Sequence, residues 1–153
     1  MRISTHTASR IILATPRAIF RAFLDPEVLV NWRPPEGLKA EITSFDPRLG
    51  GGYRMVLAYG DPEVTSGKSG DGTDVVTSRF VEFEPEARIV EAITFESDDL
   101  AFGGTMMLTT TLTKVNGGTK VSFVAENVPA GISDEDHCRG MEASLKNLAN
   151  LLE

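Results

Sequence analysis

The sequence predicts an α+β fold in which a curved, seven-stranded antiparallel sheet surrounds a long C-terminal helix. Three observations support this prediction. Six consecutive segments between residues 38 and 129 are rich in Val, Ile, Thr and aromatic residues, as strands are. Apolar residues recur at helical spacing over roughly 20 residues at the C-terminus. Two short helical patterns separate a first strand-like segment from the other six.

The N-terminal part of the chain reads as one strand followed by two short helices. Residues 3–13 alternate loosely between polar and apolar side chains, which predicts the strand. Thr15 and Pro16 mark the first helix start, because threonine caps helices and proline fits the first helical position. Asp25-Pro26 separates this helix, PRAIFRAFLD, from the second, PEVLVNW, and Pro34-Pro35 ends the second.

The six later strands are expected at residues 38–47, 53–60, 74–85, 88–97, 105–115 and 119–129. Short connections containing Gly, Asn, Asp or Pro join most of them, so strands adjacent in sequence should pair antiparallel. The connection at residues 60–74 is longer, and two interpretations are open for it: a mobile lid or an ordinary surface loop.

Three consecutive glycines, Gly50 to Gly52, raise the question of a phosphate-binding loop. Such loops lie between a strand and a helix N-terminus, whose free N–H groups bind the anion. Here a strand follows the glycines, and the pattern GxGxxG is absent. We therefore predict a hairpin turn or bulge, in which glycine allows a positive φ.

The last helix should begin after Ser133, a good N-cap, with three acidic residues in its first turn. Its apolar stripe is formed by Met141, Leu145, Leu148, Leu151 and Leu152. A sheet with one buried face needs a cover, and this helix is the one element large enough. We predict a single domain over residues 1–153, with space for a ligand between sheet and helix.

Composition disfavours several classes of function. The formal net charge of -7, with Lys and Arg scattered along the chain, argues against nucleic-acid binding, which needs a basic patch. A mean hydropathy of -0.08 leaves no membrane-spanning segment, and the N-terminus does not resemble a secretory signal. The single cysteine, Cys138, cannot form an internal disulfide. The expected localisation is cytoplasmic.

Large apolar residues from the strands, the second short helix and the last helix should line the cavity. Each of them would also fit an ordinary core position. The candidate ligand-binding residues are Trp32, Tyr53, Met55, Leu57, Phe80, Ile93, Phe95, Met107, Met141 and Leu145.

Two polar residues, Glu82 and His137, are candidate catalytic residues. If Phe80 points inward, strand alternation carries Glu82 into the cavity, where it would bind or protonate a polar group of a ligand. The alternative is that Val81 and Phe83 point inward and Glu82 is solvated. His137 lies one turn before Met141, where it would face the cavity or simply cap and pack.

The residues give no sign of a metal or cofactor. His6 and His137 are the only histidines, and no HxxxH, HExxH or CxxC pair occurs. The GxSxG sequence of a serine nucleophile is also absent. We expect neither a metal site nor a cofactor.

Four segments carry a resemblance to a known superfamily: ATPRAIFRAFLDPEVLVNWRPPEG, FDPRLGGGYRM, SRFVEFEPEARIV and HCRGMEASLKNLANLLE. In this order they resemble bacterial members of the SRPBCC superfamily, also called START-like or Bet v 1-like. Within it the chain is similar to the branch named after the C-terminal domain of the activator of Hsp90 ATPase (AHSA1-like). This resemblance implies a helix-grip fold. Relatives usually have Gly-Trp where this chain has Gly140-Met141, a change that should reshape any cavity.

Three functions are consistent with these observations. The cavity favours a binding protein for a small apolar or amphipathic ligand. An enzyme of the polyketide cyclase or hydrolase kind would need Glu82, His137 or Tyr53 to converge in the cavity. A chaperone partner of the Hsp90 type rests on the resemblance alone. A homodimer formed through an apolar outer face or an edge strand is also open.

Overall fold

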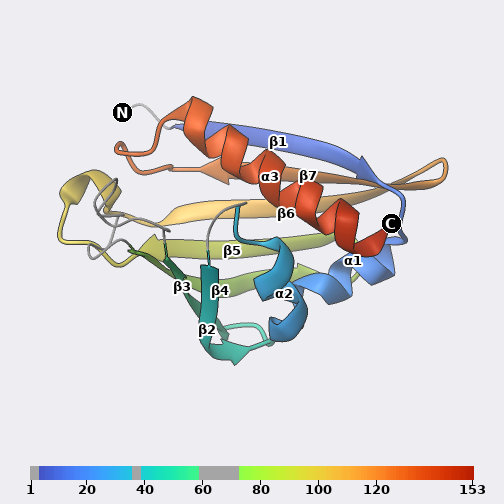
Figure 1. Ribbon diagram of the computed structural model, residues 1–153, viewed down its shortest axis with the longest axis horizontal. Coiled ribbons are helices and arrows are strands. Elements are labelled where there is room, and N and C mark those ends of the chain that lie inside the picture. The colour runs from blue at the N-terminus through green and yellow to red at the C-terminus, as the bar shows by residue number, and fades with distance from the viewer. Residues whose placement is uncertain (1–3, 36–38, 59–72) are drawn as a thin grey trace.

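The computed structural model describes residues 4–35, 39–58 and 73–153, and it confirms the predicted fold class. Seven strands form one antiparallel sheet in the order β1-β7-β6-β5-β4-β3-β2. From β2 to β7, each strand pairs with the next one in the sequence. Strand β1 pairs with β7 instead, so β1 and β2 form the two edges of the sheet. The sheet curves around the C-terminal helix, which is the helix-grip arrangement (Figure 1).

The elements follow the predicted order. They are β1 (Thr5–Ile12), α1 (Pro16–Phe23), α2 (Pro26–Trp32), β2 (Lys39–Asp46), β3 (Gly52–Ala58), β4 (Thr73–Glu84), β5 (Arg88–Phe95), the 3-10 turn η1 (Leu100–Phe102), β6 (Met106–Val115), β7 (Gly118–Glu126) and α3 (Asp134–Leu152). Most of the connection predicted at residues 60–74 lies outside the described residues; Thr73 and Asp74 belong to β4.

Thr15 and Ser133 cap the helix starts as predicted, and Asp25, expected only as a break between helices, caps the second one. The Thr15 hydroxyl accepts a hydrogen bond from the Ala18 N–H at 3.1 Å, and Pro16 occupies the first helical position. The Asp25 carboxylate caps α2, and the Ser133 hydroxyl caps α3 by accepting from the Asp136 N–H at 3.1 Å. Each side chain satisfies a backbone N–H that the helix itself leaves unpaired.

The triple glycine is a turn, as predicted. It joins β2 to β3, and both Gly50 (φ 81°) and Gly52 (φ 151°) have the positive φ that favours glycine. The turn also binds β4, because the Phe80 N–H donates to the Gly51 carbonyl at 2.9 Å. A Cβ on Gly52 would lie 1.8 Å from the Ser78 carbonyl oxygen, so the two strands approach closely there.

The α3 helix lies across the inner face of the sheet, packed against β1 and α2 (Figure 1). Its apolar stripe buries Leu145 and Leu148 completely, together with Phe23 and Trp32 from the short helices. At the C-terminus, the Glu153 carboxylate accepts a hydrogen bond from the Leu13 N–H at 3.0 Å, which ties the end of α3 to the chain just after β1.

Two register shifts help to curve the sheet. One lies in β2 between Ile42 and Ser44, and the other lies in β4 between Phe80 and Glu82. An extra residue on one strand bends that strand and increases its twist. These shifts occur in the half of the sheet that lies away from β1 (Figure 1).

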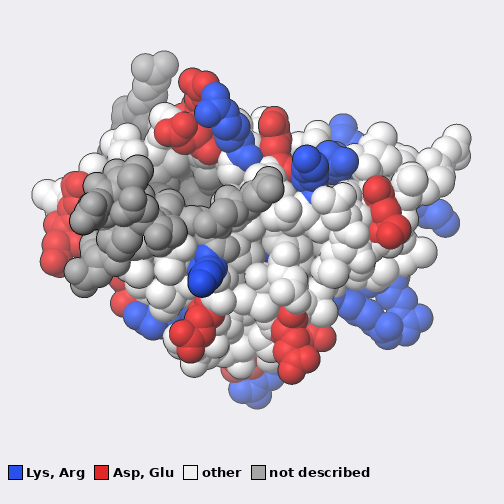
Figure 2. All heavy atoms as spheres, in the orientation of Figure 1, with Lys and Arg blue, Asp and Glu red and all other residues white. Residues whose placement is uncertain are grey.

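Charged side chains of both signs are interspersed over the described part of the face shown in Figure 2. None of the helices in the described ranges is long and apolar enough to cross a membrane.

Candidate functional site

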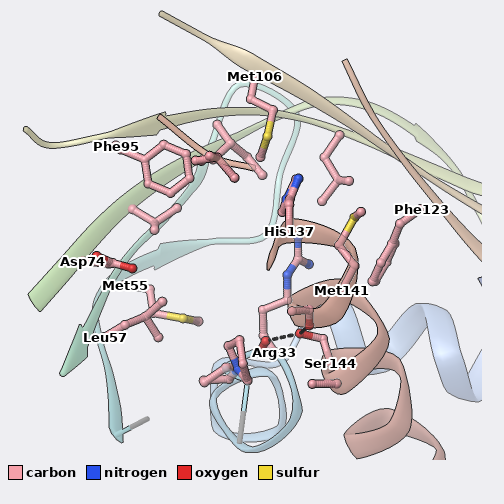
Figure 3. A pocket seen from close by; sticks show the side chains of 18 of the residues that line it. Arg33, Met55, Leu57, Asp74, Phe95, Met106, Phe123, His137, Met141 and Ser144 are labelled. Carbon is pink, nitrogen blue, oxygen red and sulfur yellow. Dashed lines mark hydrogen bonds between the residues drawn. The ribbon is translucent and has the colours of Figure 1, made fainter. Parts of the chain in front are cut away.

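A cavity of about 750 Å³ lies between the inner face of the sheet and the first half of α3. Strands β3 to β7 form one wall, α3 forms the other, and the segment Arg33–Pro35 after α2 closes one side (Figure 3). This size is typical of small-molecule sites, which span roughly 300–1,000 Å³. The cavity lies where the sheet curves away from the helix.

Strand alternation builds the sheet wall from apolar side chains. Met55 and Leu57 come from β3, and Ile93 and Phe95 come from β5, each pair two residues apart and therefore on one face. The wall is completed from β6 and β7 by Met106, Leu108 and Phe123. The two thioether groups among these side chains, Met55 and Met106, can adapt to an irregular ligand shape.

The helix wall contains both polar and apolar groups. His137, Met141 and Ser144 face the cavity because they recur at helical spacing along α3. The Ser144 hydroxyl donates to the Arg33 carbonyl oxygen at 2.5 Å, drawn as a dashed line in Figure 3. This hydrogen bond joins α3 to the end of α2.

A buried acid, Glu91, lies behind the wall at the centre of a hydrogen-bond network. It is fully buried on β5, where one carboxylate oxygen accepts from the Ser78 hydroxyl at 2.7 Å and from the Tyr53 hydroxyl at 3.1 Å. Its other oxygen accepts from Nη2 of Arg33 at 3.2 Å. A buried carboxylate with three donors, one of which is a cation, meets the conditions under which a charge is tolerated inside a protein.

Arg33 connects this network to the cavity. Its guanidinium lies among three aromatic rings, with the carbon Cζ 5.5 Å from the Trp32 ring centre, 5.7 Å from that of Phe123 and 5.8 Å from that of Phe23. Burial works to lower the pKa of Arg33, but the attraction of Glu91 and Tyr53 together with the hydrogen bond to Glu91 outweighs burial and holds the pKa above its usual value. Arg33 is therefore a permanent cation in the cavity wall.

One nitrogen of this cation has no partner. Nη1 of Arg33 is inaccessible to bulk solvent and makes no hydrogen bond within the described part of the chain. Buried polar groups in folded proteins are almost always paired, so this buried, unpaired nitrogen is an exception.

Tyr53 also lines the cavity as a neutral hydroxyl. Burial raises the pKa of Tyr53 far above its usual value, and the neighbouring Glu91 raises it further, while Arg33 acts in the opposite direction. Because its proton is donated to Glu91, this hydroxyl is committed to the buried network.

His137 meets the second histidine of the chain at the β1–α3 contact. Nδ1 of His137 lies 2.9 Å from Nδ1 of His6, so one of these nitrogens carries the shared proton and the other accepts it. His6 is buried, and its Nε2 lies 3.8 Å from the Asp134 carboxylate. His137 thus both lines the cavity and helps to attach α3 to β1.

The structure places six of the ten predicted ligand-binding residues in the cavity lining: Tyr53, Met55, Leu57, Ile93, Phe95 and Met141. Trp32, Phe80 and Leu145 instead lie in the core behind the lining, each at most 1% exposed. Met107 lies on the opposite face of β6 from Met106 and Leu108, which do line the cavity. With two methionines in succession, the apolar pattern does not distinguish the inner one.

Of the two candidate catalytic residues, only His137 lies at the cavity. Glu82 is exposed and pairs with Arg88 at 3.1 Å, so it is solvated, as the alternative interpretation predicted, but Val81, which that alternative placed inward, is exposed as well. Phe80 nevertheless points inward, and so does Phe83, whose ring centre lies 5.0 Å from that of Phe80. The bulge between Phe80 and Glu82 breaks the alternation that would have carried Glu82 inward. Glu82, Tyr53 and His137 therefore do not converge.

The most polar residues of the site, Arg33, Ser78 and Glu91, were not among the predicted ones. A signal for Glu91 exists, since it alternates with Ile89 and Ile93 in a strand whose two isoleucines are buried. Arg33 has no such signal, because it follows α2 in a segment without periodicity.

Comparison with known proteins agrees with this architecture. The family described as Activator of Hsp90 ATPase homolog 1-like protein matches residues 13–153. A crystal structure of a protein from Chromobacterium violaceum is 34% identical, with a TM-score of 0.85 over 97% of this chain and 96% of that one. The comparison with curated proteins found no match.

More distant structures share the fold. A protein from Rhizobium loti is 25% identical, with a TM-score of 0.73 over 97% of this chain and 96% of that one. One from Rhodobacter sphaeroides is 22% identical, with a TM-score of 0.74 over 99% of this chain and 97% of that one. The sequence match over nearly the whole chain and the shared helix-grip fold lead to one conclusion: this chain belongs to the family of activator of Hsp90 ATPase homolog 1-like proteins.

Proposed function

We propose that the protein binds a small amphipathic molecule in the cavity between the sheet and α3. The observation that carries this proposal is a mostly apolar cavity of about 750 Å³ whose lining also includes the polar residues Arg33, His137 and Ser144. Ligand sites are typically apolar spaces with a few polar groups that fix orientation. This cavity has that composition.

The arrangement favours binding over catalysis. A cyclase or hydrolase would need an acid or base in the cavity beside a second reactive group. Glu82 is on the outside, and both Tyr53 and Ser78 donate their protons to Glu91. The buried network supplies a fixed arrangement and a charge, and its hydroxyl protons are already donated to Glu91.

Native mass spectrometry of the protein purified from its own host tests the proposal. We expect a stoichiometric small molecule that is released on denaturation, and extraction then identifies its class. The matched control is Ala143→Trp, because Ala143 lines the cavity and an indole there would fill the space. Empty wild-type protein under gentle conditions, together with no binding of added apolar probes, would contradict the proposal.

The family supports a second proposal, a chaperone-associated role, because the matching family is named for an activator of the Hsp90 ATPase. Addition of this protein to an Hsp90-type ATPase from the same host should then raise the rate of ATP hydrolysis. An unchanged rate, together with no capture of that ATPase on the immobilised protein, would remove this proposal and leave the first intact.

A further inference from the structure

We propose that the apolar body of the cavity ligand is a flat, fused-ring aromatic system, held by the thioether groups of Met55, Met106 and Met141. This inference rests on the proposed function and adds the chemical class of the ligand. It follows from the shape of the sheet wall and from the kinds of side chain that surround the cavity.

The sheet wall is broad in two directions, because strand pairing aligns its inward side chains in two rows. One row crosses β3 to β5 and contains Met55, Val76 and Phe95. The second row crosses β3 to β6 and contains residues that line the cavity, except for Ser78: Tyr53, Ser78, Ile93 and Met106. With strands about 4.8 Å apart and rows two residues apart, the two rows cover roughly 14 Å by 7 Å. A fused-ring system would lie across both rows, whereas a single acyl chain would cover only one of them.

Thioether groups reach the cavity from three different elements. Met55 comes from β3, Met106 from β6 and Met141 from α3, and Figure 3 shows them on three sides of the space. Methionine is unbranched and its sulfur is polarizable, so it adapts to a ring and favours contact with it at about 5 Å. Each such contact strengthens binding by about two- to tenfold. A saturated body of the same size would not gain this contribution.

Two phenylalanines of the lining also favour an aromatic ligand. Phe95 comes from β5 and Phe123 from β7, and in the view of Figure 3 they lie on opposite sides of the space. Aromatic rings attract one another in edge-to-face or offset arrangements, beyond the effect of the area that they bury. A ring in the cavity would therefore meet either a thioether or a phenyl group on several of its sides.

Three alcohols with the same number of carbon atoms test the inference: naphthol, decahydronaphthol with its hydroxyl at the same ring position, and decanol. Their dissociation constants are measured by NMR titration of the wild-type protein. We expect naphthol to bind at least about tenfold more tightly than decahydronaphthol, because only the aromatic ring gains from the thioether and phenyl groups.

The methionine methyl groups report where the ring lies. The chain contains 5 methionines, so labelling of their methyl groups with carbon-13 gives a spectrum that can be assigned by mutation. The ring current of bound naphthol should move the signals of Met55, Met106 and Met141, which line the cavity. The signal of Met107, on the opposite face of β6, should stay in place. Decahydronaphthol has no ring current and should move all of these signals much less.

Substitution by leucine separates the effect of sulfur from that of apolar volume. Met55→Leu, Met106→Leu and Met141→Leu keep the side chains apolar and similar in size, so the fold should tolerate them. Each should weaken the binding of naphthol by about two- to tenfold and leave that of decahydronaphthol within about twofold. The matched control is Met107→Leu, which changes the next residue after Met106 but on the outer face, and it should affect neither probe.

The outcomes distinguish this inference from the function on which it rests. If decahydronaphthol binds as tightly as naphthol, or decanol does so after correction for its partition into octanol, apolar area alone determines binding. The aromatic inference is then overturned while the cavity still binds small molecules. If naphthol is preferred but the three leucine variants bind it like the wild type, the thioether groups are not responsible and the inference is wrong. If none of the three probes binds, the proposed function fails and the inference fails with it.

Discussion

Arg33 and Glu91 are 58 residues apart in sequence, yet inside the protein Nη2 of the first lies 3.2 Å from a carboxylate oxygen of the second. The pair joins the end of α2 to the middle of β5. Both side chains are almost fully removed from solvent, with exposures of 13% and 1%. Mutation of either residue should therefore produce a measurable change in the free energy of unfolding.

Removing one member of the pair should destabilise the protein strongly. Glu91→Gln leaves the Arg33 cation buried without a counter-charge, so the free energy of unfolding should fall by about 3–5 kcal/mol. Arg33→Met/Glu91→Gln should recover most of this loss, because neither charge then remains inside. Urea unfolding of Glu91→Gln, Arg33→Met and the double variant measures the coupling.

The exposed ion pair between Arg54 and Glu96 provides the matched control. These side chains are 40% and 49% exposed, and their atoms lie 2.7 Å apart. Solvent-exposed pairs contribute about 0–1 kcal/mol, so Glu96→Gln should cost no more than this. An equal loss of stability in Glu91→Gln and Glu96→Gln would show that burial of the Arg33–Glu91 pair is energetically irrelevant.

Two glycines of one turn should respond differently to alanine. Gly50→Ala meets no atom within 4 Å, so only its positive φ opposes the change, at a cost of roughly 1–2 kcal/mol. In Gly52→Ala the new methyl group would also overlap the Ser78 carbonyl, so the cost should exceed about 3 kcal/mol. Thermal unfolding of both variants checks the order, and equal costs would contradict the close approach of β3 and β4.

Gly140 should behave in the opposite way, because it lies inside α3, where glycine is unfavourable. A Cβ there would make ordinary contact with Pro35 at 3.8 Å. Gly140→Ala should therefore raise the free energy of unfolding by roughly 0.5–1 kcal/mol. A loss of stability would show that α3 and the Pro35 segment are closer than this contact allows.

The thiol of Cys138 should react slowly with alkylating reagents. Burial raises the pKa of Cys138, and its hydrogen bond to the Asp134 carboxylate raises the pKa further. Less thiolate is therefore present at neutral pH, and the rate of reaction with iodoacetamide should reach half its plateau at a more alkaline pH than for a free cysteine.

Asp134→Asn should shift this pH profile towards neutral pH and speed the reaction, because the negative charge beside the thiol is lost. Glu135→Gln is the control, since the Glu135 side chain pairs with Arg139. Identical profiles for wild type and Asp134→Asn would mean that burial alone sets the reactivity.

Local patterns in the sequence predicted the fold well because they report on local causes. Thr15, Asp25 and Ser133 cap the helices because their side chains accept hydrogen bonds from free backbone N–H groups. The glycine turn joins β2 to β3 because glycine tolerates the positive φ there. Antiparallel pairing then follows from short connections between consecutive strands. These features need no knowledge of distant contacts.

The polar part of the site could not be predicted in the same way. Charged residues usually lie at the surface, so Glu91 reads as an outward residue unless its alternation with Ile89 and Ile93 is given more weight. Its partner Arg33 comes from a segment without periodicity, and only the folded chain brings the two together. The apolar residues of the lining were partly predicted because apolar alternation identifies the faces of a strand. The pattern does not separate Met106, which lines the cavity, from Met107, which follows it on the other face.

The bulge in β4 gives the chain a position at which its length can change. Phe80 pairs with Glu91 and Glu82 pairs with Val90, so Val81 has no partner across the ladder and its side chain is exposed. Deletion of Val81 would leave Phe80 and Phe83 inward and Glu82 outward in plain alternation, whereas deletion of Arg79 would turn Phe80 outward. Thermal unfolding should show the first deletion to be far milder. Homologues that differ in length by one residue here would therefore keep the same interior.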